Sequence, residues 1–133
     1  MLALVVAIVA AVVVLFALFG LVGKNQPGLE KGPFREAWRG IIEKAASEST
    51  FALAIINADK LLDSALKKRN FKGETMGERL VSAKNILSKR QRVWEAHKLR
   101  NRLVHDETVK LDRKKTLDAL KGFESALKDL GAL

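Results

Sequence analysis

The stretch FALAIINADKLLDSALKK, residues 51–68, decides the fold class. Its apolar side chains recur at intervals of three and four residues, which is the spacing of one face of an α-helix. That face consists of Phe51, Ala54, Ile55, Ala58, Leu61, Leu62, Ala65 and Leu66. A face this wide is typical of a helix that packs in the core of a bundle. The stretch therefore predicts an amphipathic helix, ending near Lys68, in an all-α protein.

The flanking segments repeat the helical spacing from Pro33 to the C-terminus. Pro33 suits the first turn of a helix, because the N–H that proline lacks would be unpaired there. The apolar positions are Phe34, Trp38, Ile41, Ile42 and Ala45, then Leu80, Ala83 and Leu87, and last Leu117, Leu120, Phe123, Leu127 and Leu130. The predicted N-terminal caps are Thr75 with Glu78, Ser88 and Asp112. Residues 34–133 are thus expected to form a compact antiparallel bundle of four to five helices.

The N-terminal segment has a different composition. Residues 2–22 carry no charged or polar side chain. A bilayer core of about 30 Å needs about 20 apolar residues in a helix, so residues 1–23 are predicted to be a single transmembrane anchor. The alternative is a cleavable signal peptide, but no Lys or Arg precedes the run and no clear cleavage site follows it. Residues 24–33 are rich in Gly and Pro and predict a flexible linker.

The charge of the chain indicates the side of the membrane and the class of partner. Lys24, Lys31, Arg35 and Arg39 follow the apolar run, so the bundle is expected to face the cytoplasm. The absence of cysteine fits that compartment. The chain has 24 basic and 15 acidic residues, a formal net charge of +9. This balance favours a polyanionic partner, either RNA or anionic lipid. The predicted RNA contacts are Lys98, Arg102, Lys110, Arg113, Lys114 and Lys115.

The segment HKLRNRLVHD, residues 97–106, holds both histidines of the protein. At about 100° per residue, Arg100 lies about 60° from His97, and both fall within the apolar arc of this helix. Asn101 and His105 fall at the edge of the arc, one turn apart on the same side.

Burying an unpaired arginine is costly, so Arg100 needs an acidic partner. Asp59, at the margin of the apolar face of residues 51–68, is the predicted partner. Asp63, one turn further on, is the second choice.

Residues 100–105, Arg-Asn-Arg-Leu-Val-His, resemble the Arg-polar-x-x-x-His motif of HEPN domains. These are small all-helical bundles found in many prokaryotic ribonucleases, toxins and partners of nucleotidyltransferases. The resemblance implies a homodimer that cleaves RNA without a metal or other cofactor. It implies that His105 acts as general base or acid in the attack of the ribose 2′-OH on the phosphate. Arg100 would then stabilise charge on the phosphate, and Asn101 would orient the substrate or His105.

Three functions stay open on the sequence. The first is a membrane-tethered endoribonuclease of the toxin or defence type, with an antitoxin or other protein as its partner. The second is a non-catalytic membrane-anchored adaptor or dimerisation module, in which Arg100 and His105 are structural. The third is binding of RNA or lipid by the basic surface alone. Five residues of separation place Arg100 and His105 about 140° apart on an unbroken helix, so an intramolecular site would require a frayed helix.

Overall fold

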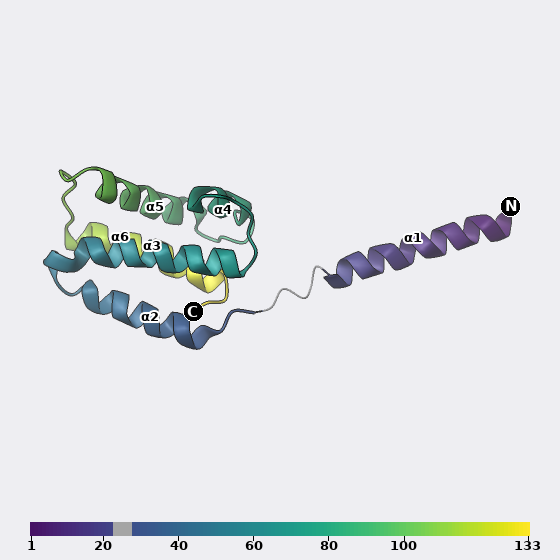
Figure 1. The fold of residues 1–133 in the computed structure, drawn as a ribbon, viewed down its shortest axis with the longest axis horizontal. Coiled ribbons are helices and arrows are strands. Elements are labelled where there is room, and N and C mark those ends of the chain that lie inside the picture. Colours follow the sequence, from purple (N-terminus) through teal and green to yellow (C-terminus); the bar gives the residue numbers. More distant parts are fainter. Residues whose placement is uncertain (23–27) are drawn as a thin grey trace.

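The computed structural model describes the backbone of residues 1–22 and 28–133, and the side chains of residues 1–17 and 28–133. Within these residues the chain is all-α (Figure 1). The six α-helices and one 3₁₀ helix are α1 (Leu2–Val22), α2 (Lys31–Lys44), η1 (Glu48–Thr50), α3 (Phe51–Lys68), α4 (Met76–Ser82), α5 (Arg90–His105) and α6 (Arg113–Asp129). The predicted all-α class is confirmed.

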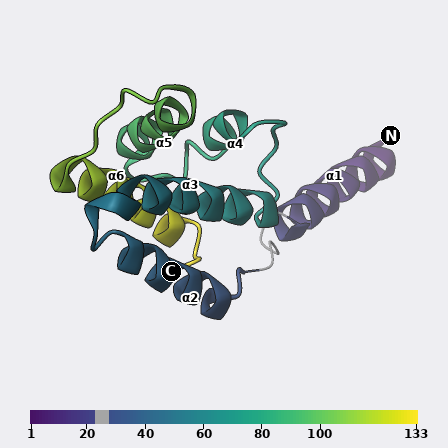
Figure 2. The same ribbon diagram turned by 60° about the vertical axis from the view of Figure 1, so that its left-hand side comes forward.

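Helices α2 to α6 pack as a compact bundle around α3. Helix α3 contacts each of α2, α4, α5 and α6, and its central place can be followed in Figures 1 and 2. Its fully buried side chains include Ile55, Leu62 and Leu66, which pack with Phe123 and Leu127 of α6. All the buried apolar residues that the structure describes lie between Phe34 and Ala132. The bundle therefore contains its own core.

Three predicted helix ends are present. Helix α3 ends at Lys68 as expected. At the start of α4, the Thr75 side chain accepts a hydrogen bond from the backbone N–H of Glu78, and the Glu78 carboxylate accepts one from the backbone N–H of Thr75, which completes a capping box. Asp112 caps α6 by accepting a hydrogen bond from Lys115 N at 2.7 Å.

Three local predictions are wrong. Ser88 does not cap α5, which begins after Lys89; Ser88 N and Oγ instead donate to the Asp129 carboxylate of α6. Helix α4 ends at Ser82, although Ala83 and Leu87 beyond it are buried. Ile42 of α2 is 46% exposed, because α2 packs on α3 by a narrower face than its apolar spacing suggested.

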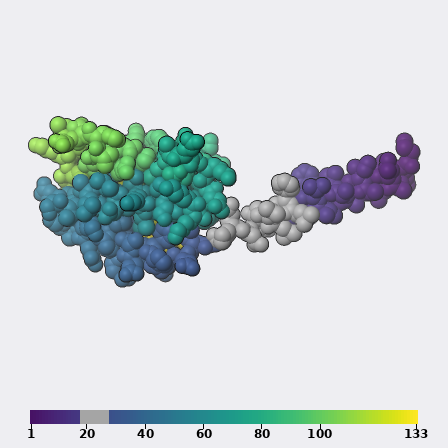
Figure 3. All heavy atoms as spheres, viewed as in Figure 1, coloured from purple at the N-terminus to yellow at the C-terminus, as the bar shows by residue number. Residues whose placement is uncertain are grey.

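Helix α1 lies apart from the bundle, and the side chains described along it are exposed (Figure 3). Among the residues that the structure describes, no helix is both long enough and apolar enough to span a bilayer. The predicted helix over residues 2–22 is therefore confirmed, and the predicted transmembrane span is not. Residues 24–27 of the predicted linker lie outside the described residues, and residues 31–33 already belong to α2.

Candidate functional site

A buried polar network joins α3 to the middle of α5. Asp59 is 3% exposed and His97 is 7% exposed. Asp59 Oδ1 lies 2.8 Å from His97 Nδ1, and His97 Nε2 lies 3.3 Å from Asn101 Nδ2. Arg100 Nη1 donates to Asn101 Oδ1 at 3.0 Å. The network thus connects three residues of the HKLRNRLVHD segment to one carboxylate of the neighbouring helix.

The hydrogen bonds of His97 engage both of its ring nitrogens. Asn101 Oδ1 accepts from Arg100, so the amide nitrogen of Asn101 faces the histidine. An amide nitrogen only donates, so His97 Nε2 must accept, and Nδ1 carries the proton that it donates to Asp59. Each ring nitrogen of His97 thus has one hydrogen-bond partner.

Arg100 is held beside Asp59 by charge rather than by a directed hydrogen bond. Its Nε lies 3.4 Å from Asp59 Oδ2, which is ion-pair distance. The same Nε is buried and has no hydrogen-bond partner, because it is not aligned with the carboxylate. We therefore treat the contact as Coulombic attraction. The structure places the predicted pair together, with a third of the Arg100 side chain (33%) still exposed.

The network forms one wall of an open cleft of about 610 Å³ between α3, the start of α4 and α5. Trp94 lies beside His97, with 5.9 Å between the ring centroids. Gly77 of α4 faces both rings: a Cβ built on it would lie 3.8 Å from His97 Nε2. The cleft is also lined by the cations Lys60, Lys98 and Arg100, together with the acidic Asp63.

His105 lies outside this buried network. It is the last residue of α5 and is exposed. Helix α5 runs without a break from Arg90 to His105, so the frayed helix that an intramolecular site requires is not present. The next residue, Asp106, accepts hydrogen bonds from the Thr108 side chain and backbone, which lower its pKa. Within one chain, Arg100 and His105 do not converge on a common point.

The predicted RNA contacts are all exposed and lie along α5, α6 and the loop between them. An open groove of about 390 Å³ between α5 and α6 is lined by Lys98, Arg102 and Lys115, together with Arg92. Acidic side chains interrupt it: Glu95 pairs with Lys98 at 3.0 Å, and Asp118 pairs with Lys114 at 3.0 Å. Lys110 and Arg113 are exposed at the α5–α6 loop and the start of α6.

A second charged pair is not anticipated by the sequence. Arg79 of α4 is 7% exposed and makes two hydrogen bonds to Asp63, at 2.7 and 3.0 Å. Burial raises the pKa of Asp63, but hydrogen bonds from Arg79 and Lys67 outweigh it, so the pKa is lowered overall. Asp63, the second-choice partner of Arg100, is thus bound to α4. The only sequence signal for this pair is an arginine at a core-facing position of a short helix.

Comparison of the chain with protein-family models, with curated proteins and with solved structures gives no match. In the described parts of the chain, no three His, Asp or Glu side chains gather as metal ligands. The arrangement supplies a buried histidine, a half-buried arginine and an exposed histidine at a helix end.

Proposed function

We propose that the protein is a membrane-anchored, HEPN-like helical adaptor that binds a partner without cleaving it. The observation that carries this proposal is the engagement of Arg100 in the fold. Its Nε is buried beside Asp59, and its Nη1 holds the Asn101 amide that in turn contacts His97. An arginine that is held in a buried network is less able to contact a phosphate and stabilise the negative charge that develops on it.

The membrane anchor in this proposal rests on α1. Helix α1 has 21 residues, and the apolar run continues in sequence beyond Ala17, where the described side chains end. At about 1.5 Å per residue, such a helix is about 30 Å long, the thickness of a bilayer core. Its described side chains are exposed, for example Val6 at 60% and Phe16 at 75%. A lipid environment would cover this surface, with the bundle on the cytoplasmic side.

A specific observation favours a second candidate, the metal-independent endoribonuclease. His105 is exposed at the end of α5, and part of Arg100 reaches the cleft beside Lys98. These two groups do not converge within one chain, but His105 of one copy and Arg100 of another could do so in a homodimer. The exposed cations along α5 and α6 would then bind the RNA backbone.

One experiment separates the two functions. The fragment 28–133 holds the whole described core, so it is incubated with a mixed RNA substrate in the presence of EDTA, and its oligomeric state is measured by sedimentation. The adaptor predicts no cleavage by the folded protein in either its monomeric or its dimeric state. Cleavage that disappears in both Arg100→Ala and His105→Ala would refute the adaptor and support the ribonuclease.

Thermal melts give a second, independent readout. Because Arg100 is part of the network and His105 is exposed, Arg100→Ala should lower the melting temperature by several degrees, whereas His105→Ala should not change it. The matched control is Lys110→Ala, an exposed change near His105. If Arg100→Ala melts like the unmodified protein, Arg100 does not organise the fold, and the adaptor loses its main support.

A further inference from the structure

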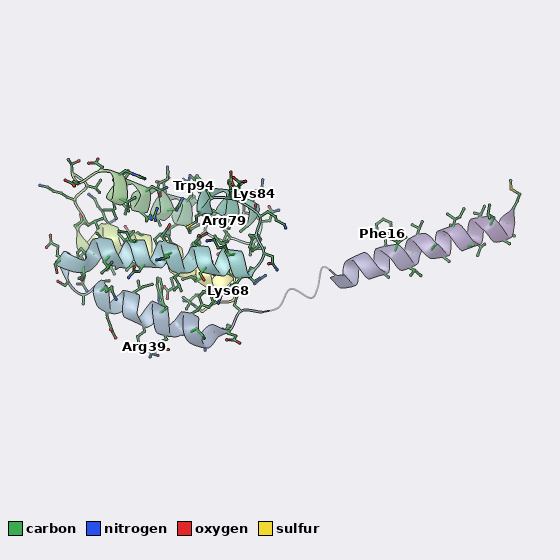
Figure 4. The ribbon with its side chains drawn as sticks, in the orientation of Figure 1. Phe16, Arg39, Lys68, Arg79, Lys84 and Trp94 are labelled. Atoms are coloured by element: carbon green, nitrogen blue, oxygen red, sulfur yellow. The ribbon has the colours of Figure 1, made fainter. Side chains whose placement is uncertain are left out.

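One end of the bundle gathers the segments closest to the linker. Helix α2 begins there at Lys31, whose Nζ lies 3.3 Å from the carbonyl oxygen of Leu133. At the end of α3, Lys68 Nζ lies 5.5 Å from the centre of the Phe34 ring, and Arg69 donates to the Leu130 carbonyl at 2.6 Å. Ser88, just before α5, binds Asp129 at the end of α6. We call this the tether-proximal end; Figure 4 labels Lys68 and Lys84 on it.

The tether-proximal end is strongly basic. Residues 67–90, from the end of α3 to the start of α5, contain eight basic and two acidic residues. Six of these cations are exposed: Lys67, Lys68, Lys72, Lys84, Lys89 and Arg90. The two acidic residues, Glu74 and Glu78, leave this segment with a formal net charge of +6, from eight basic minus two acidic residues.

Apolar side chains lie among these cations. Val81 is 55% exposed and Ile86 is 40% exposed. Beside them, an apolar groove of about 220 Å³ between α4 and α5 is lined by Leu80, Val81, Leu87, Val93 and Trp94, with Lys84 and Arg90 among its lining residues. Exposed apolar side chains flanked by Lys and Arg are the combination that binds at the interface of an anionic membrane.

We propose that the tether-proximal end docks on the anionic surface of the membrane that holds α1, with Val81 and Ile86 at the interface and Lys84, Lys89 and Arg90 on lipid headgroups. This inference rests on the proposed anchoring of α1. Charge complementarity is the first argument for a lipid occupant. The second argument is the length of the connection between α1 and α2. The eight residues 23–30 span at most about 3.6 Å each, so the tether-proximal end stays within about 30 Å of the membrane.

Docking in this way would fix the orientation of the bundle. The α5–α6 loop lies at the far end of α5 from the α4–α5 groove, so His105 and Lys110 would face away from the bilayer (Figure 1). The surface that carries Arg102 and Lys115 would stay open to a partner in the cytoplasm. The exposed basic residues would thus form two sets, one that faces the membrane and one that faces a partner.

The test uses the full chain reconstituted in vesicles, in a Trp38→Phe background so that Trp94 is the only fluorophore of its kind. Vesicles contain a nitroxide-headgroup lipid in either a purely zwitterionic or a mixed anionic bilayer. Docking predicts stronger quenching of Trp94 in the anionic vesicles, reduced by added salt because the attraction is screened. The variant Lys84→Glu/Lys89→Glu/Arg90→Glu should lose the additional quenching.

The matched control is Lys110→Glu/Arg113→Glu/Lys115→Glu, which reverses the same number of charges at the opposite end and should keep the quenching. Equal quenching in the two kinds of vesicle, or equal loss in both variants, overturns the proposal. A high-salt and carbonate wash tests the anchor separately: a chain that washes off refutes the anchor and with it this orientation. A different outcome is that Lys84→Glu/Lys89→Glu/Arg90→Glu abolishes binding of an RNA oligonucleotide but keeps the Trp94 quenching. This surface would then be an RNA contact, and lipid docking would be refuted.

Discussion

The substitution Asp59→Asn tests the polar network directly, because Asp59 is its only carboxylate. Asparagine has nearly the same size and keeps one oxygen that can accept from His97, but it removes the negative charge beside Arg100. Removing one partner of a fully buried ion pair costs about 3–5 kcal/mol. Since the Arg100 side chain is 33% exposed, water screens part of this loss. We expect Asp59→Asn to lower the free energy of unfolding by about 2–3 kcal/mol.

This loss is measured by thermal and urea unfolding of the fragment 28–133. In a domain of about 100 residues, each kcal/mol shifts the melting temperature by about 4–8 °C, so a decrease of about 10–20 °C is expected. The control Glu95→Gln, also a carboxylate-to-amide change but on an exposed side chain, should leave the melting temperature unchanged.

A double-mutant cycle with Arg100→Met isolates the pair. In the Arg100→Met background, Asp59→Asn should cost about 1–2 kcal/mol less than in the unmodified protein, because the charge that it would strand is already absent. A cost of Asp59→Asn within about 0.5 kcal/mol of zero, or fully additive losses, would refute the reasoning that Asp59 neutralises a half-buried arginine.

Two further predictions concern packing and pH. In Gly122→Ala, the new Cβ would lie 2.9 Å from the carbonyl oxygen of Arg92; α5 and α6 must separate, and the urea midpoint should fall by the equivalent of about 1–3 kcal/mol. The control Gly40→Ala, with open space around its Cβ, should not lower the urea midpoint. Equal midpoints for the two variants would contradict the close approach of α5 and α6 at Gly122. The lowered pKa of Asp63 means that its ionised form adds stability above its unfolded pKa of about 3.9, which is lost as pH falls through the folded pKa. Asp63→Asn should therefore destabilise the protein at neutral pH, and this difference should shrink below about pH 4. A difference that is constant with pH would show that the carboxylate charge is not responsible.

Local sequence patterns predicted much of the fold. The apolar spacing of residues 51–68 identified the helix that became the middle of the bundle, because a residue's place on a helix follows from its position alone. Thr75 with Glu78, and Asp112, were recognised as caps because capping involves only neighbours in the sequence. The predicted cap at Ser88 is wrong because its hydroxyl and N–H bind a distant residue, Asp129, which is 41 residues away in the sequence. No local pattern contains that contact.

The candidate site, like the fold, could be predicted from the sequence only in part. The helical arrangement of HKLRNRLVHD already placed His97 and Arg100 inward and His105 at the edge. It did not identify Asp59 as the hydrogen-bond partner of His97, nor did it pair Arg79 with Asp63. Which carboxylate meets which cation depends on how α3, α4 and α5 are rotated and shifted relative to one another.

By itself, the sequence determined the all-α class, several helix bounds, the apolar N-terminal helix and the excess of positive charge. These follow from the periodicity and composition of single segments. Only the tertiary structure decided that one buried aspartate serves both His97 and Arg100, and that α5 continues unbroken to His105. It also decided that a basic, partly apolar surface lies at the end from which the linker departs. The physical reason is that a side chain's partner is selected by helix packing, which brings together residues separated by tens of positions.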